Sequence, residues 1–190
     1  MRAGLSAPAR QRRTSHPAIE PLPRLRSFSA VAARQAHTLI LGSMPGAESL
    51  RAGEYYAHPR NAFWPIMGDL FGATPDLPYR QRLQKLTNAG IALWDVLAEC
   101  HRPGSLDAAI DTRSAVANDL PSLLKQHPQI GRIFFNGATA ERCFYRHLAK
   151  SLPLQRYLLQ RLPSTSPAHA SMSFPEKRDA WRIVAEAAAR

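Results

Sequence analysis

The sequence predicts an α/β fold: a three-layer α/β/α sandwich with a central, four-stranded, mainly parallel sheet. Four short apolar runs have the length and composition of buried strands, and amphipathic helical patterns separate them. Strands that alternate with helices favour a parallel sheet that is covered on both faces. The chain has 190 residues, of which 45% are hydrophobic, which suits one packed domain and is short for two.

The predicted strands cover residues 37–42 (HTLILG), 91–95 (IALWD), 132–136 (RIFFN) and 157–162 (YLLQRL). Helical spacing of apolar side chains occupies residues 63–71, 116–124 and 140–148. A last helix is expected to open with the capping-box pattern Ser173 to Glu176 and to bury Trp181.

Positive charge is concentrated near the amino terminus. The whole chain carries a net charge of +11, and residues 1–36 hold seven arginines against one acid, Glu20. We interpret residues 1–36 as a flexible basic tail that can touch nucleic-acid phosphates, followed by one domain over residues 37–190. The alternatives are a solvated tail without function, or a start site placed too far upstream.

Composition also excludes several classes of protein. Two cysteines, Cys100 and Cys143, cannot form a disulfide scaffold or a four-cysteine metal centre, and they are expected to be structural. No phosphate-binding, dinucleotide-binding or hydrolase-elbow motif is present, and no apolar run is long enough to cross a membrane. We also expect a monomeric protein without metal or cofactor, located in the cytoplasm, or on the nucleoid if bacterial.

Loops with small and polar residues follow each predicted strand. They contain residues 42–46, Asp95, Asn136 with Gly137, and residues 162–170. The carboxyl ends of parallel strands meet at one edge of a sheet, where open α/β folds bind their ligands. The sequence therefore places the candidate site at this edge.

Four motifs then occur in a specific order: GSMPG at residues 42–46, YYAHPRNAFW at 55–64, FNG at 135–137 and LPSTS at 162–166. They resemble motifs of the uracil-DNA glycosylase superfamily, and in detail they are most similar to its hypoxanthine-DNA (deoxyinosine) glycosylase family. The resemblance covers roughly residues 28–190. It implies a monofunctional DNA repair enzyme that hydrolyses the N-glycosidic bond of a deaminated base, hypoxanthine first, flipped out of DNA. The alternatives are a uracil or mismatch glycosylase, a non-catalytic binder of damaged DNA, and an unrelated enzyme acting on a small nucleoside or nucleotide.

Two positions depart from the uracil-removing relatives. Met44 stands where those relatives carry an Asp or Asn that positions water, and Leu162 replaces a His or Asn that stabilises the departing uracil. A thioether neither orients water nor takes its proton. These departures predict a different base, with Met44 lining the base site.

The chemistry itself selects further candidates. A base anion must be stabilised and a water aimed at C1′. Backbone N–H groups of residues 42–46, with Ser43 among them, can supply the positive pole. Asn61 is the candidate for positioning the water, and its alternative role is to cap the helix that starts beside it. Tyr56 falls where the resemblance places a base-stacking aromatic residue.

Base recognition and the mouth of the site have their own candidates. Asp95 can accept a hydrogen bond from N1–H of hypoxanthine, or else cap a turn over residues 96–100. Asn136 is a second base-binding candidate, with a structural turn as its alternative. His58 can contact the base and Arg60 a phosphate, although both also suit an exposed loop.

The loop after the fourth predicted strand is expected to hold DNA. Ser164, Thr165, Ser166 and His169 are candidates for phosphate contacts, which position DNA without reading its sequence. Alternatively, the loop is a plain connection that caps the next helix. Met172 and Phe174 are available as wedges into the duplex, and neither is assigned.

Overall fold

The central layer of the fold is a parallel sheet of four strands. A computed structural model describes residues 24–188. The sheet has the strand order β3-β2-β6-β7, and every neighbouring pair is parallel. Its strands are β2 (Thr38–Gly42), β3 (Ile91–Asp95), β6 (Arg132–Asn136) and β7 (Leu158–Leu162). The predicted α/β/α sandwich and its four strands are therefore confirmed.

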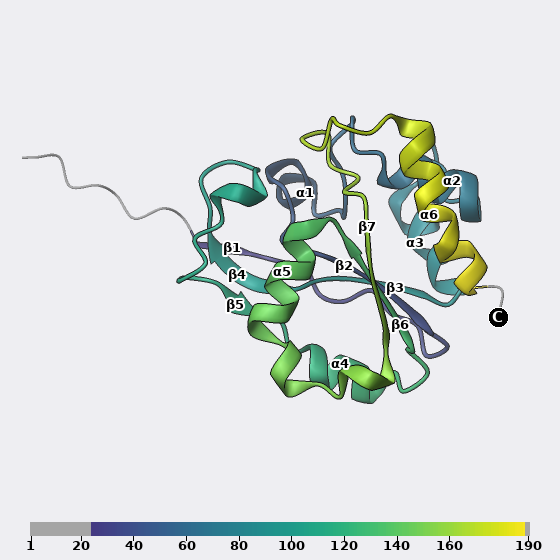
Figure 1. The fold of residues 1–190 in the computed structure, drawn as a ribbon. Coiled ribbons are helices and arrows are strands. Elements are labelled where there is room, and N and C mark those ends of the chain that lie inside the picture. Colours follow the sequence, from purple (N-terminus) through teal and green to yellow (C-terminus); the bar gives the residue numbers. More distant parts are fainter. Residues whose placement is uncertain (1–23, 189–190) are drawn as a thin grey trace, which may run out of the picture.

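Helices cover both faces of this sheet (Figure 1). Ile40 of β2 faces a cluster with α2 (Phe63–Phe71), α3 (Tyr79–Asn88) and α6 (Phe174–Ala188). Leu39 and Leu41 face the opposite cluster, which includes α4 (Leu120–Gln126) and α5 (Ala138–His147). Successive side chains of a strand point to opposite faces, so an uninterrupted apolar strand serves two hydrophobic layers.

Shorter elements complete the chain. A short helix α1 (Ala47–Ala52) follows β2. Three 3₁₀ turns lie in later connections: η1 (Asp107–Ala109), η2 (Ala149–Ser151) and η3 (Leu154–Arg156). The capping box of α6 is confirmed, because the Ser173 N–H donates to Glu176 at 2.7 Å and the Glu176 N–H points back to Ser173 Oγ at 3.5 Å.

A second, antiparallel sheet was not expected from the sequence. It consists of β1 (Arg24–Arg26), β4 (Leu97–His101) and β5 (Val116–Ala117), in the order β1-β4-β5. The prediction of a turn over residues 96–100 is wrong, because only one residue, Val96, separates the end of β3 from the start of β4. Val116, which the helical spacing included, lies in β5, and α4 begins only at Leu120.

Part of the predicted basic tail lies on the domain. Arg24 and Arg26 of β1 both form ion pairs with Glu99 of β4. Val31 exchanges two backbone hydrogen bonds with Leu93 of β3. Residues 24–36 therefore pack where a flexible segment was expected, and the other 23 residues of that segment lie outside the described residues.

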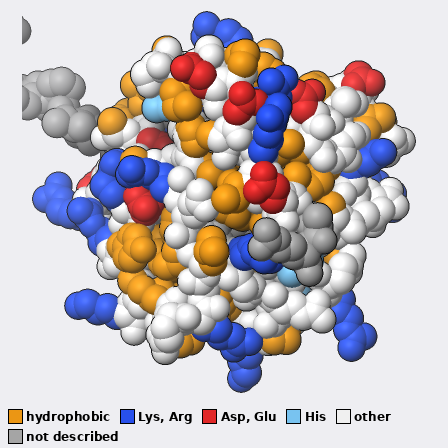
Figure 2. Space-filling model, turned by 45° about the vertical axis from the view of Figure 1, so that its right-hand side comes forward, with side chains coloured by type: hydrophobic (Ala, Val, Ile, Leu, Met, Phe, Trp, Pro, Cys, Tyr) orange, Lys and Arg blue, Asp and Glu red, His pale blue; other side chains and the backbone are white. Residues whose placement is uncertain are grey.

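The surface beside α6 mixes charges of both signs (Figure 2). Arg178 and Arg182 of α6 both form ion pairs with Asp179, and Arg178 also lies 3.9 Å from Asp69 of α2. Such exposed pairs contribute little stability. No helix among residues 24–188 is both long and apolar enough to cross a membrane.

Candidate active site

Four strand ends meet at the carboxyl edge of the parallel sheet, as the sequence predicts. Gly42 at the end of β2 is paired in register with Asp95 at the end of β3, and Asn136 at the end of β6 is paired with Leu162 at the end of β7. The loops after these strands supply the candidate residues. No group of three or more His, Cys, Asp or Glu suitable for a metal ion occurs among the described residues.

The loop after β2 is fixed by residues that the sequence analysis missed. Arg102, fully buried just after β4, donates from Nη2 to the Pro45 carbonyl at 2.5 Å and from Nη1 to the Met44 carbonyl at 3.5 Å. The Ser43 hydroxyl donates to Asp107 Oδ1 at 2.8 Å. Arg102 and Asp107 lie about 60 positions from this loop and belong to no motif, so only the folded chain reveals them.

Met44 is part of the hydrophobic core. Its side chain is 5% exposed and packs in the cluster that contains Phe135 and Cys143. This burial leaves little of the thioether for contact with a base, and its main visible role is to anchor the loop.

Asp95 is a buried carboxyl group held against the backbone of β2. A Cβ atom on Gly42 would lie 2.4 Å from Asp95 Oδ1, so the close approach depends on glycine. Asp95 Oδ2 is buried without a hydrogen-bond partner among the described residues. Burial first, and the charge of Asp107 second, raise the pKa of Asp95 to about 8, against a smaller opposing effect of Arg102. Asp95 is therefore mostly protonated at neutral pH, and its alternative role as a turn cap is wrong because β4 follows.

Tyr56 approaches the same place from the loop before α2. Its ring stacks on Phe63 with 3.9 Å between centroids, so one face of the ring is covered. Its hydroxyl lies 3.3 Å from the position of a Cβ on Gly42 and has no hydrogen-bond partner among the described residues. Burial raises the pKa of Tyr56, so the hydroxyl keeps its proton. Two unpartnered polar groups, one from Asp95 and one from Tyr56, thus meet at the end of β2.

Asn61 lies at the start of α2. Its Oδ1 accepts from the Phe63 N–H at 3.0 Å, so Asn61 supports the start of the helix, although the N-cap residue of α2 is Ala62. The amide group at its other end is not used by that contact. His58 Nδ1 accepts from the Arg60 N–H at 3.1 Å and the His58 carbonyl accepts from the Asn61 N–H, which makes residues 58–61 a compact turn. Arg60 itself is exposed.

The loop after β7 is clipped to β6 by a reciprocal pair of hydrogen bonds. Asn136 Nδ2 donates to Thr165 Oγ1 and the Thr165 N–H donates to Asn136 Oδ1, both at 2.9 Å. Thr165 is 1% exposed, so the expectation that its side chain contacts phosphate is wrong. Both the Nδ2 and the Oδ1 of Asn136 take part in this clip, which favours the structural role of Asn136.

The remaining residues of that loop stay partly accessible. Ser164 packs over Gly137, whose φ of +94° and lack of a side chain allow the contact. Ser166 and His169 are half-buried, and the His169 carbonyl accepts from the buried ammonium of Lys177 at 2.6 Å. Lys177 of α6 thus anchors the loop after β7 through its backbone.

The clip carries a testable consequence for stability. Thr165→Val keeps the shape of the side chain but leaves Asn136 Nδ2 buried without an acceptor, which should lower the free energy of unfolding by about 1–3 kcal/mol. Thr165→Ser keeps the hydroxyl and should lose clearly less. Urea unfolding of both variants checks this, and a larger loss for Thr165→Ser than for Thr165→Val would show that the methyl group matters instead of the hydroxyl.

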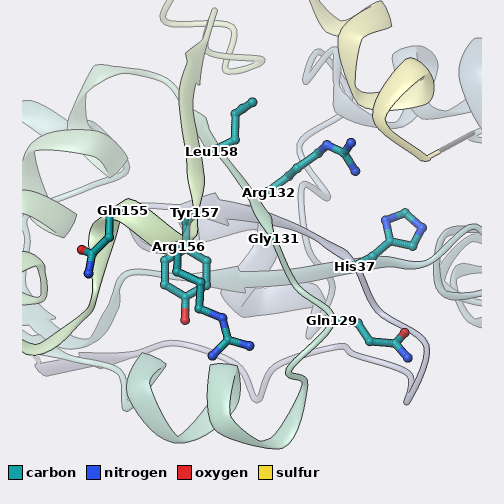
Figure 3. Close-up of a pocket in the computed structure, with 8 residues that line it drawn as sticks. All are labelled: His37, Gln129, Gly131, Arg132, Gln155, Arg156, Tyr157 and Leu158. Carbon is teal, nitrogen blue, oxygen red and sulfur yellow. The ribbon is translucent and has the colours of Figure 1, made fainter.

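A shallow groove of about 640 Å³ lies at the other edge of the sheet (Figure 3). It is lined by residues that precede or begin β2, β6 and β7, among them His37, Arg132 and Tyr157. This is the amino end of the parallel strands, so the groove is separate from the candidate site.

Comparison with known proteins agrees with this geometry. The model of the Uracil DNA glycosylase superfamily matches residues 28–188. A Hypoxanthine DNA glycosylase of Methanosarcina acetivorans is 34% identical over 160 residues, covering 84% of this chain and 96% of the relative. The protein of the same name from Methanosarcina barkeri is 35% identical over 111 residues, covering 58% of this chain and 69% of the relative.

A solved structure extends the likeness to the fold. The solution NMR structure of a candidate uracil DNA glycosylase from Methanosarcina acetivorans has a TM-score of 0.73 and 32% identity, and the match covers 88% of this chain and 100% of the other. The family model matches most of the chain, and a relative is 34% identical over nearly its whole length. The chain therefore belongs to the uracil DNA glycosylase superfamily.

Proposed function

We propose that the chain is a monofunctional DNA glycosylase that removes a deaminated base, hypoxanthine first, from DNA. The names of the two Methanosarcina relatives support this substrate. The observation that carries it is the pair of buried, unpartnered polar groups of Asp95 and Tyr56 at the carboxyl edge of the sheet. Buried polar groups without partners cost free energy, and a bound base that supplies hydrogen bonds would remove that cost.

The reaction breaks the bond between C1′ of the deoxyribose and a nitrogen of the base. Positive charge develops on the sugar and negative charge on the departing base, so the site must stabilise both and admit one water. The backbone N–H groups of Ser43, Met44 and Gly46 are the proposed positive pole. Arg102 fixes their loop through the carbonyls of Met44 and Pro45. The target nucleotide must leave the stack to reach the site.

Two residues before α2 have proposed roles on the flipped nucleotide. Tyr56 would stack on the base with the ring face that Phe63 does not cover. Asn61 would hold the attacking water with its free amide group, while its Oδ1 remains on the Phe63 N–H. One side chain would then serve both the start of the helix and the reaction.

Asp95 is the proposed partner for the polar edge of the base. A neutral carboxyl group both donates and accepts a hydrogen bond, which matches N1–H and O6 of hypoxanthine. The same group can also match adenine by moving its proton, so Asp95 alone does not discriminate between the two bases. Fixed backbone donors near O6 would have to supply that discrimination.

Contacts with the DNA backbone are proposed for exposed and half-buried residues around the site. Ser164, Ser166 and His169 belong to the loop after β7, and Arg60 to the turn before α2, with His58 at the mouth of the site. Phosphate contacts of this kind position the duplex and weaken as salt is added.

A single-turnover assay with the protein in excess tests the proposal. Duplexes that carry one hypoxanthine, uracil or adenine are incubated, treated with alkali and analysed for cleavage. We expect cleavage at hypoxanthine to be the fastest. Faster cleavage at uracil would point to a uracil glycosylase, and DNA binding without release of any base would point to a non-catalytic reader of damage.

A further inference from the structure

A carboxylate reaches the loop after β2 from a distant part of the chain. Asp107 lies in η1, and its Oδ1 accepts from the Ser43 hydroxyl at 2.8 Å. With its own proton committed to Asp107, the Ser43 oxygen keeps lone pairs that can accept a proton from another group. The side chain of Asp107 is 40% exposed, so it keeps contact with solvent although burial is the largest influence on its ionisation.

The segment that carries Asp107 is fastened to this loop at several points. Arg102 binds the carbonyls of Met44 and Pro45, and its Nε also donates to the Gly104 carbonyl at 3.0 Å. The Ala47 N–H donates to Ser105 Oγ at 3.0 Å. Asp107 is therefore held beside Ser43 by the backbone as well as by its own side chain.

Burial and the nearby charges of Arg102 and Arg142 set the ionisation of Asp107. Arg102 Nη1 lies 3.9 Å from its Oδ1, and Arg142 of α5 adds a second positive charge. Both, with the Ser43 hydroxyl, favour the carboxylate, although burial outweighs them and raises the pKa of Asp107. Asp95 is the other acid of this cluster, and it is mostly protonated at neutral pH. Asp95 and Asp107 therefore suit different tasks, because their environments differ. Of these two acids, only Asp107 has a cation within ion-pair distance and a side chain that contacts solvent.

Resting on the proposed function, we propose that Asp107 accepts, through the Ser43 hydroxyl, the proton of the water that attacks C1′. The water oxygen forms a bond to C1′ while the bond from C1′ to the base nitrogen breaks, and its electron pair leaves with the base. The water proton passes to Ser43 Oγ, and the Ser43 proton passes to Asp107 Oδ1. The products are an abasic sugar with a hydroxyl at C1′, a base anion that takes a proton from solvent, and a protonated Asp107 that returns its proton to solvent.

The proposed relay accepts the proton of the attacking water, which Met44 cannot do. A thioether does not take a proton from water at neutral pH, and the residue at that position is buried in the core. Asn61 can orient a water but does not accept its proton. The structure thus separates the two tasks, with orientation at the start of α2 and proton acceptance at η1.

Asp107→Asn is the central test. The amide oxygen can still accept from Ser43, but it does not take a proton, so the single-turnover rate of hypoxanthine release should fall about 100-fold. Affinity for the same duplex should be unchanged. Ser43→Ala should lose a similar factor, and the double variant should be no slower than either single variant, because the two groups act as one unit.

Two further readouts separate proton transfer from a structural role. The wild-type rate should rise with pH as Asp107 ionises, and Asp107→Asn should lose that dependence. Formate added to Asp107→Ala should restore part of the rate, because it supplies a small carboxylate. Asp111→Asn is the matched control, since Asp111 lies four positions on, at an exposed turn where its Oδ1 accepts from the Arg113 N–H.

The outcomes distinguish this inference from the proposed function. An active wild-type protein with an equally active Asp107→Asn overturns the relay alone. A slow Asp107→Asn that keeps the wild-type pH profile, together with an Asp107→Ala that formate does not rescue, assigns Asp107 a structural role and also overturns it. A wild-type protein that releases no base overturns the proposed function and the relay together.

Discussion

Asn61→Ala is expected to lower the single-turnover rate of hypoxanthine release by about 100- to 1,000-fold, while affinity for the duplex stays within a few-fold. The reason is the loss of the amide group that we propose to hold the attacking water, a contact of the kind whose removal costs this much in other enzymes. Release of base and DNA binding are measured on the same preparation.

The second role of Asn61 requires a matched variant. Its Oδ1 accepts from the Phe63 N–H, so Asn61→Ala should also lose about 1 kcal/mol of stability. Asn61→Ser keeps an oxygen for the helix start but has no amide. A stable Asn61→Ser without activity supports the catalytic role, whereas an active one reduces Asn61 to a helix cap.

Asp95→Asn is expected to stabilise the protein at pH 8 by several kcal/mol and to change little at pH 4. In the folded chain the pKa of Asp95 is raised to about 8, while in the unfolded chain it is near its ordinary value of 3.8. A raised folded-state pKa gives stability that is fully present below the unfolded-state pKa and is lost as pH rises through the folded-state pKa. Between pH 4 and pH 8 this loss is of the order of 5 kcal/mol.

The measurement is urea unfolding at intervals between pH 4 and pH 8. An asparagine has no charge to bury, so the free energy of unfolding of Asp95→Asn should decline less steeply with pH than that of the wild type. The residual slope should include Asp107, whose pKa is also raised by burial. Asp119→Asn is the control, because Asp119 caps α4 from an exposed position and Asn caps equally well. Parallel curves for wild type and Asp95→Asn would show that Asp95 is ionised when folded.

The parallel sheet was predictable because each of its strands lies in a short run dominated by apolar residues, although Gln160 and Arg161 interrupt the run of β7. The antiparallel sheet was not predictable, because two of its three strands are very short. β1 has only the three residues Arg24–Arg26, and its two arginines are typical of a solvated tail in the sequence. Only the folded chain places Glu99 opposite them. β5 has only two residues, and Val116 at its start fits the spacing of the following helix as well as it fits a strand. Elements this short are fixed by their partners, which sequence patterns do not reveal.

The candidate site was predictable where residues follow a strand or belong to a motif. Asp95 was placed at the edge correctly, but its protonation depends on burial and on Asp107, which only the folded chain shows. The sequence analysis did not single out Arg102, because nothing in its sequence neighbours marks a guanidinium that is fully buried. Thr165 failed as a phosphate contact for the same reason, because its partner Asn136 is 29 positions away.

The strand order also sets when the site can form. In β3-β2-β6-β7 every neighbour is distant along the chain: Thr38 of β2 pairs with Ile91 and with Arg132. Contacts of such long range require the closure of large loops, which slows folding. During synthesis, nearly a hundred residues must follow β2 before its second neighbour, β6, leaves the ribosome. The residues of the contact between Ser43 and Asp107 are synthesised before those of the clip from Asn136 to Thr165. During synthesis, the contact between the loop after β2 and η1 can therefore form before the loop after β7 is available.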